Sequence, residues 1–126
     1  MKTKELTVLM VEPRQHPKVT TIKDDLDSLQ KAVSIGSDYQ GLIEIISLGN
    51  GDCLLCNEEG KLIGLEGNRR LGDDILVGVF YILSEDSDGN LVSLTGQKIK
   101  RYTELFWEPE TFDPAEIEAI LTCHFF

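Results

Sequence analysis

Short apolar runs separated by turn residues recur along most of this chain, a pattern typical of β-strands. The first run spans residues 6–11 and stops at Glu12-Pro13, because proline cannot donate to a strand ladder. A second run, residues 18–22, follows a polar loop that carries a further proline. The two runs are therefore predicted to pair as an antiparallel hairpin.

A helix is predicted directly after this hairpin. Leu26, Leu29 and Val33 recur at helical spacing, so one face of the segment is apolar. Asp24 is the predicted N-cap and Gly36 is the predicted end of the helix.

Residues 42–94 change to short apolar runs between turn signals, which predicts a meander of about five antiparallel strands. The runs are 42–48, 53–56, 61–65, 75–83 and 91–94. Turns are predicted at 49–52, 57–60 and 86–90, with Gly60 at positive φ in the second turn.

The last third of the chain is predicted to be helical. Thr95 begins a helix whose inward-facing residues share helical spacing; these are Ile99, Tyr102, Leu105 and Phe106. A second helix over about 113–123 begins with an N-cap Asp113, followed by Pro114 and then Glu116. Because the helix after the first hairpin and the Thr95 helix each have one apolar stripe, both are expected to cover the same face of the sheet.

These elements predict one α+β domain over residues 1–126. Its expected architecture is a mainly antiparallel, twisted sheet of six or seven strands, with one helix after the first hairpin and two C-terminal helices. The pattern contains no internal repeat and no interdomain linker.

The net charge of the chain excludes some classes of binding partner. The chain has 22 acidic and 12 basic residues, a formal net charge of −10, so neither direct nucleic-acid binding nor membrane binding is expected. Three cysteines without a secretion signal indicate reduced thiols and a cytoplasmic protein. Residues 102–126 carry six acidic and no basic side chains, an uneven distribution that suits either a DNA mimic or a solvated helix face.

Several motifs in the middle of the chain carry a resemblance to a known family. They are Cys56-Asn57-Glu58-Glu59-Gly60-Lys61-Leu62, Gly64-Leu65, Asn68-Arg69, Asp74-Ile75, Gly78 and Phe80. The flanking motifs are the Val-Leu-x-Val-Glu-Pro form of residues 8–13, Ser28-Leu29-Gln30 and Ser93-Leu94-Thr95. Together they resemble the bacterial domain-of-unknown-function family DUF3846 over residues 6–106. The resemblance implies a fold and a setting in Gram-positive bacteria, their phages and conjugative elements, and it implies no reaction and no catalytic residue.

Two cysteines, Cys53 and Cys56, have the spacing of a zinc knuckle, which Cys123-His124 could complete. The Leu-Leu between them favours a strand, in which residues three apart point to opposite faces. We therefore expect buried thiols and no metal or other cofactor. Glu58 and Glu59 are expected at the solvated tip of a turn, where they specify no acid-base chemistry.

The predicted recognition site comprises Asn57, Asn68, Arg69 and Arg70, placed in connections between strands. Arginine binds carboxylate or phosphate through a rigid fork, and asparagine offers both a donor and an acceptor. The alternative is that the two arginines form local ion pairs with Glu66, Asp73 and Asp74. If Arg69 serves recognition, Arg69→Lys should leave stability nearly unchanged and weaken binding.

Three function classes follow from the sequence. The leading hypothesis is a non-catalytic binding or accessory protein of a bacterial mobile element or phage, acting through protein contacts or a small anionic ligand. The second is an acidic DNA mimic of the anti-restriction type, and the third is an enzyme without a recognisable motif.

Overall fold

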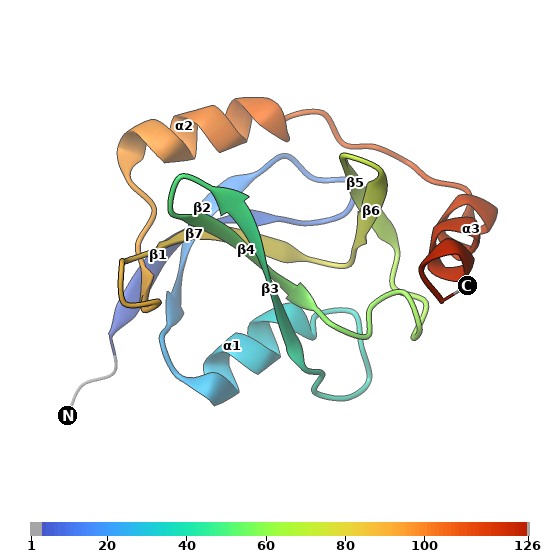
Figure 1. The fold of residues 1–126 in the computed structure, drawn as a ribbon, viewed down its shortest axis with the longest axis horizontal. Coiled ribbons are helices and arrows are strands. Elements are labelled where there is room, and N and C mark those ends of the chain that lie inside the picture. Colours follow the sequence, from blue (N-terminus) through green and yellow to red (C-terminus); the bar gives the residue numbers. More distant parts are fainter. Residues whose placement is uncertain (1–3, 126) are drawn as a thin grey trace.

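The computed structural model describes residues 4–125, with side chains as far as residue 120. Two strands precede the first helix, six strands follow it, and two helices come last (Figure 1). The strands are β1 (Glu5–Val11), β2 (Lys18–Lys23), β3 (Ile43–Gly49), β4 (Asp52–Asn57), β5 (Gly67–Leu71), β6 (Asp74–Val77), β7 (Phe80–Glu85) and β8 (Leu91–Val92). The helices are α1 (Leu26–Val33), α2 (Gly96–Leu105) and α3 (Pro114–Phe125).

Six strands form one antiparallel sheet in the order β2-β1-β7-β4-β3, with β8 paired to β7. The hairpin predicted from the first two runs is confirmed, with Leu6 opposite Ile22 and Met10 opposite Lys18. Strands β5 and β6 form a separate two-stranded hairpin. The α+β class, the antiparallel sheet, the helix after the first hairpin and the two C-terminal helices are all as predicted.

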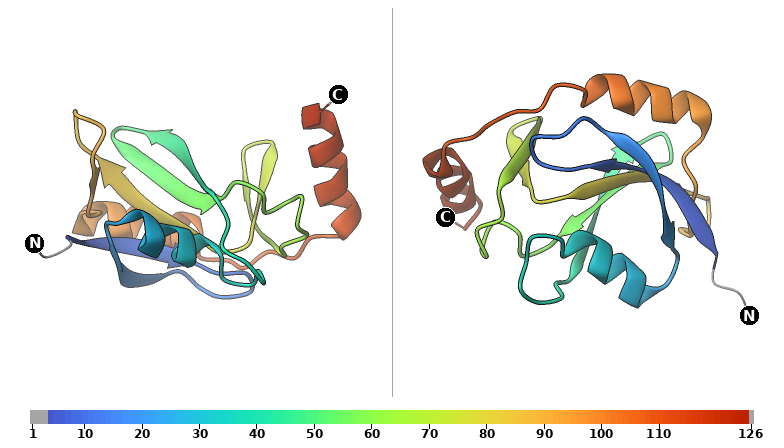
Figure 2. Two further views of the ribbon diagram at one scale, coloured as in Figure 1. Left: turned by 90° about the horizontal axis from the view of Figure 1, so that it is seen from below. Right: turned by 180° about the vertical axis from the view of Figure 1, so that it is seen from behind.

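The sheet lies between α1 and α2, which cover opposite faces (Figures 1 and 2). Leu29 and Val33 of α1 pack in one core with Val8 and Leu55, whereas Tyr102 of α2 packs in another. The prediction that both helices cover one face is therefore wrong. A single apolar stripe shows that a helix packs on a sheet, but the connecting segments decide on which face.

Helix α1 begins one residue later than predicted. Asp25, not Asp24, is the N-cap, and its side chain accepts a hydrogen bond from the backbone N–H of Ser28 at 2.7 Å. The helix also ends at Val33, before Gly36, which has a φ of +90° in the turn that follows.

Helix α2 begins after Thr95 as predicted, but Leu105 is 63% exposed and lies off the buried stripe. Its contact with the sheet is polar as well as apolar. Buried Asp52 of β4 accepts hydrogen bonds from Lys98 Nζ at 2.6 Å and from the Tyr102 hydroxyl at 2.6 Å. Ser84 of β7 donates a third bond at 3.1 Å. Burial raises the pKa of Asp52, but these hydrogen bonds outweigh it and hold that pKa below its ordinary value.

The middle of the chain departs most from the sequence prediction. Residues 61–65 do not form the predicted strand, and 61–64 are turns instead. The apolar run 75–83 divides into β6 and β7 at Gly78, whose φ is +69°. Gly60 does not have the positive φ predicted for it, although its N–H bonds to the Asn57 carbonyl oxygen as in a β-turn. The chain continues from this turn into further turns, so no hairpin forms there.

The β5–β6 hairpin lies between the main sheet and α3. Leu76 packs in the same core as α2, whereas Ile75 and Val77 pack with Phe112 and Ile117 on the side of α3. The capping predicted for α3 is confirmed, since the Asp113 side chain accepts a hydrogen bond from the N–H of Ala115 at 2.9 Å. Within residues 4–125, no helix has the length and hydropathy needed to cross a bilayer.

Candidate functional site

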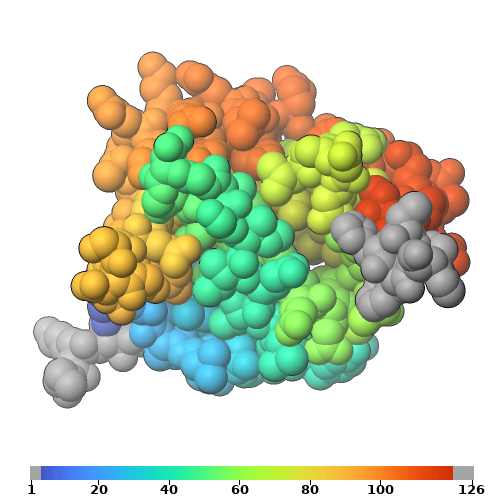
Figure 3. All heavy atoms as spheres, in the orientation of Figure 1, coloured from blue at the N-terminus to red at the C-terminus, as the bar shows by residue number. Residues whose placement is uncertain are grey.

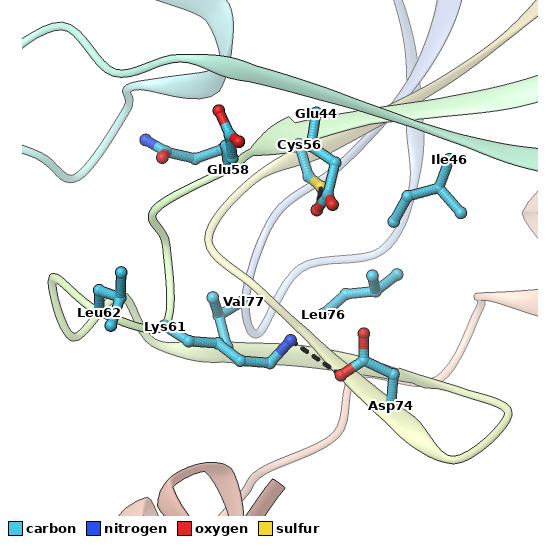
Figure 4. A pocket seen from close by; sticks show the side chains of 10 residues that line it. Glu44, Ile46, Cys56, Glu58, Lys61, Leu62, Asp74, Leu76 and Val77 are labelled. Carbon is cyan, nitrogen blue, oxygen red and sulfur yellow. Dashed lines mark hydrogen bonds and ion pairs between the residues drawn. The ribbon is translucent and has the colours of Figure 1, made fainter. Parts of the chain in front are cut away.

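A cleft of about 240 Å³ separates the β3–β4 edge of the main sheet from the β5–β6 hairpin. One wall comes from β3 and β4, and the other comes from β6 and the turns that precede β5 (Figure 4). The residues that line the cleft are Glu44, Ile46, Cys56, Asn57, Glu58, Lys61, Leu62, Asp74, Leu76 and Val77. The cleft exists because Leu76 packs in the core shared with β4, which brings a hairpin from later in the chain beside it.

Two polar contacts face each other across this cleft. Lys61 Nζ lies 2.8 Å from Asp74 Oδ1 on the hairpin side, and the Cys56 thiol donates to Glu44 Oε1 at 3.6 Å on the sheet side (Figure 4). The Lys61 and Asp74 side chains are 21% and 35% exposed, so this ion pair is only partly screened by water.

The Cys56 thiol is not an activated nucleophile. Burial, and then the neighbouring Glu44 carboxylate, raise its pKa to about 12. A thiolate is the reactive form of cysteine, so at neutral pH this side chain is a protonated hydrogen-bond donor.

The cleft combines apolar walls with an excess of negative charge. Three carboxylates line it, those of Glu44, Glu58 and Asp74, against the single ammonium group of Lys61. Ile46, Leu76 and other aliphatic side chains supply the walls. This arrangement suits a ligand that has an aliphatic stem and a cationic head.

Of the residues predicted from the sequence, Asn57 lines the cleft. It is buried at the end of β4, where its Nδ2 donates to the Val33 carbonyl oxygen at 3.3 Å and its Oδ1 accepts from the Glu59 N–H at 2.9 Å. Both contacts stabilise the wall of the cleft, because they attach the end of β4 to α1 and to the following turn.

Asn68 and Arg69 lie in β5, not in a connection as the sequence predicted, and both are buried. Asn68 Nδ2 donates to the carbonyl oxygens of Val11 and Gly78, each at 2.8 Å. Arg69 donates to the carbonyl oxygens of Phe106 and Gln15 and to the backbone and side-chain oxygens of Asn68. These bonds attach the hairpin to the end of β1, to the β1–β2 loop and to α2.

The structure does not bring the arginines together with the carboxylates that the sequence suggested as partners. None of the ion pairs among the described side chains includes Arg69. Arg70 points the other way, with Nη2 at 3.4 Å from Glu116 Oε2 and its guanidinium 5.2 Å from the centre of the Phe112 ring. Arg70 therefore joins β5 to the start of α3, outside the cleft.

Sequence reasoning missed Glu44, Lys61 and Asp74 as residues of one site. The available signal for Glu44 was a charge between Ile43 and Ile45 in a largely apolar strand. Nothing in the spacing of Lys61 and Asp74 indicates their contact, because it depends on how β6 folds back over the turns.

Cys53 and Cys56 project to opposite faces of β4, as predicted: Cys53 packs in the core of α1 and Cys56 in the core of α2. The side chains of Cys123 and His124, which the sequence analysis considered and rejected as further zinc ligands, lie outside the described residues. Among the side chains that are described, no three His, Cys, Asp or Glu residues cluster closely enough to hold a metal ion.

Comparison with known proteins gives a family and no activity. No curated protein and no solved structure is similar enough to this chain to be matched. A family model with the description "Domain of unknown function (DUF3846)" matches residues 4–107, from β1 to the end of α2, and leaves α3 outside. Because this match covers most of the 126 residues, the chain belongs to the DUF3846 family.

Proposed function

We propose that this chain is a non-catalytic binding protein whose cleft takes a side chain with a cationic end, such as lysine or arginine. The observation that carries the proposal is the charge of the cleft, whose lining residues include three carboxylates and one ammonium group. Lys61 already pairs with Asp74, which leaves Glu44, whose carboxylate points toward the hairpin, as the acceptor for an incoming cation (Figure 4). The aliphatic walls would contact the stem of that side chain.

The residues predicted from the sequence have distinct parts in this proposal. Asn57 belongs to the cleft wall, and Asn68 and Arg69 position the hairpin that forms the opposite wall. Arg70 belongs to the contact with α3. A cation is favoured over the small anion suggested by the arginines, because the guanidinium of Arg69 is buried and already donates four hydrogen bonds.

Binding is favoured over the two alternatives by specific contacts. For an enzyme, the Cys56 thiol is the nearest candidate nucleophile, but its raised pKa keeps it protonated. For a DNA mimic, the acidic C-terminal region should present its carboxylates to solvent as a continuous row. Glu110 accepts a bond from the backbone of Arg70, and Glu116 pairs with its side chain, so a cation interrupts that row.

The proposal also covers the cellular compartment and the genomic context of the protein. We place the protein in the cytoplasm of a bacterium, as an accessory protein encoded by a phage or conjugative element. The two buried free cysteines support a reducing compartment. Genes of integration, conjugation or phage assembly beside the coding sequence would support the genomic setting, and a stable chromosomal operon of metabolic enzymes would contradict it.

Binding of a cation can be measured by two-dimensional ¹⁵N NMR. The probes are the Nα-acetyl, N-methylamide derivatives of lysine and arginine, titrated into the labelled protein. We expect saturable shifts at the amides of Glu44, Cys56 and Asp74 with at least one probe. The norleucine derivative, which has the stem without the charge, should cause no saturable shifts, and neither should inorganic phosphate.

Paired variants test whether the carboxylates carry the binding. Glu44→Gln should weaken the binding of the cation by about two- to fivefold, the effect expected for one exposed charge contact. Glu5→Gln, which removes the same charge from the exposed first residue of β1, outside the cleft, should leave that binding unchanged. Saturable binding of phosphate, or equal binding of norleucine and lysine derivatives, would overturn the proposal.

A further inference from the structure

Strand β3 is an unpaired edge of the main sheet. It bonds to β4 on one side, and no strand among residues 4–125 pairs with it on the other. The carbonyl oxygen of Leu42 accepts a hydrogen bond from the N–H of Glu58, just beyond the paired residues Ile43 and Asn57. In an antiparallel ladder alternate residues bond to the same neighbour, so Ile43, Ile45 and Ser47 direct their N–H and C=O groups away from β4.

This edge has few of the features that usually prevent strand addition. Residues 43–49 contain no lysine, arginine or proline, Ile45 is 51% exposed, and the only irregularity lies at the hairpin end, between Ser47 and Gly49. The opposite edge, β2, carries a lysine at each end, Lys18 and Lys23. Figure 3 shows the green segment that contains β3 at the surface of the face that is drawn.

The charge beside this edge selects the chemistry of an added strand. Glu44 and Ile46 of β3 line the cleft, so the cleft opens beside the face of the sheet on which those two side chains lie. Alternate side chains of a strand added to β3 would project on that same face, next to Glu44. A second copy of this chain would bring another Glu44 and a further charge of −10, whereas a basic segment would complement both.

We propose that β3 binds an extended, basic segment of a partner protein as an added strand, with a lysine or arginine of that segment entering the cleft. This rests on the proposed function for the cationic side chain, and it adds the kind of partner and the backbone contacts. Pairing of main-chain groups supplies affinity, and the cleft selects a cation at one alternate position.

The probe is an acetylated and amidated ten-residue peptide in which lysine and valine alternate. Two control peptides have glutamate in place of lysine, or N-methyl groups on every backbone amide. With the lysine peptide, hydrogen exchange of the Ile43, Ile45 and Ser47 amides should slow by at least about tenfold, because ladder bonds protect amides until they open. The amides of Glu44 and Ile46, which already bond to β4, should change little. The N-methylated peptide should give no protection.

Proline variants provide a matched test of the edge. Ile45→Pro removes an outward donor from β3 and should weaken binding of the lysine peptide by at least about tenfold, the loss expected for one broken main-chain contact and a displaced strand. Val19→Pro is the control, since Val19 is 54% exposed on the opposite edge strand. Ile45→Lys, which keeps the backbone donor and adds a like charge, should also weaken binding if Ile45→Pro does not fold.

The outcomes separate this inference from the proposed function. If the lysine derivative binds the cleft but the peptide leaves the β3 amides unprotected, strand addition is wrong and the cation site stands. If the glutamate peptide protects β3 as well as the lysine peptide does, the basic partner is wrong and so is the role of the cleft. If the β3 amides become protected in the protein alone as its concentration rises, with a dimer in light scattering, the occupant is a second copy and the inference is overturned.

Discussion

Arg69 Nε donates a hydrogen bond to the carbonyl oxygen of Phe106 at 2.9 Å, which joins the β5–β6 hairpin to the C-terminal end of α2. Phe106 is the C-cap of α2, where carbonyl groups have no partner within the helix. A buried guanidinium is therefore stabilised both by this hydrogen bond and by the negative end of the helix dipole.

This contact predicts the effect of Arg69→Lys on stability. Lysine has one nitrogen and cannot reach Phe106, Gln15 and Asn68 together, so buried carbonyl oxygens would lose their donors. We expect the free energy of unfolding, measured in urea, to fall by about 2 kcal/mol or more. This reverses the expectation from the sequence that Arg69→Lys leaves stability nearly unchanged.

Arg70→Lys is the matched control for Arg69→Lys. The Arg70 side chain is 49% exposed, forms one long ion pair with Glu116 and lies over the Phe112 ring, so the change should alter stability by less than about 1 kcal/mol. Equal unfolding midpoints for the two variants would show that the buried bonds of Arg69 do not stabilise the fold.

Asp52→Asn should remove a pH-dependent part of the stability. Burial alone would raise the pKa of Asp52. The hydrogen bonds from Lys98 and Tyr102 outweigh that effect and hold the pKa below its ordinary value of 3.8 in the folded protein. A carboxyl whose folded pKa is depressed stabilises the fold above its unfolded pKa, and this contribution is lost as pH falls through the folded pKa. At pH 7 the variant should be less stable by about 2 kcal/mol or more, since it leaves Lys98 beside a neutral amide.

The difference between the wild-type protein and Asp52→Asn should shrink when urea unfolding is repeated below about pH 4, near the ordinary pKa of an aspartate. Asp38→Asn, which removes the same charge from an exposed loop, serves as the control and should show almost no difference at either pH. A deficit in Asp52→Asn that is constant from pH 7 to pH 3 would contradict the ionic role of this group.

Local patterns predicted the elements whose partners are close in the chain. The β1–β2 hairpin, the start of α2 and the capping of α3 follow from apolar periodicity and from residues within a few positions. The strand that was missed, β5, has polar residues where a strand would show apolar ones. Asn68 and Arg69 are buried only because Val11, Gly78 and Phe106, all distant in sequence, supply their hydrogen-bond partners.

The candidate site could be predicted from the sequence only in part. Asn57 lines the cleft, but Glu44 and Asp74 lie thirty positions apart and line the same cleft because β6 packs against β4. Periodicity reports which residues of an element face inward, and it does not report which elements meet. The same limit explains the helices: each stripe was predicted, but the face of the sheet that each one covers was not.

Gly60→Ala should destabilise the protein through a collision and not through backbone strain. A Cβ atom at Gly60 would lie 2.8 Å from Val77 Cγ2, closer than packed carbon atoms approach. We expect a loss of about 1–3 kcal/mol, the range for overpacking a core. Gly64→Ala tests backbone strain without a collision, because Gly64 has a φ of +76° and no atom lies within 4 Å of the Cβ that alanine would add.

A double variant identifies the cause directly. Val77→Ala removes the methyl group that the new Cβ would meet, so the cost of Gly60→Ala should be smaller in the Val77→Ala background than in the wild-type protein. If the two changes are additive in urea unfolding, the collision is not the source of the loss.

The thiols of Cys53 and Cys56 should be unreactive while the protein is folded. Burial first, and then nearby carboxylates, raise the pKa of each to about 12, so the thiolate that reacts with a disulfide reagent is scarce at pH 8. In a Cys123→Ser background, which leaves only these two cysteines, labelling by a chromogenic disulfide should be at least about a hundredfold slower than in urea-unfolded protein, because labelling requires opening of the fold.

The two thiols should also bind no zinc. They lie in cores on opposite faces of β4 and so cannot chelate one ion, and elemental analysis of the tag-free protein should find no stoichiometric zinc. Rapid labelling of either thiol in the native state, or one zinc per chain that is lost in Cys56→Ser, would contradict this assignment.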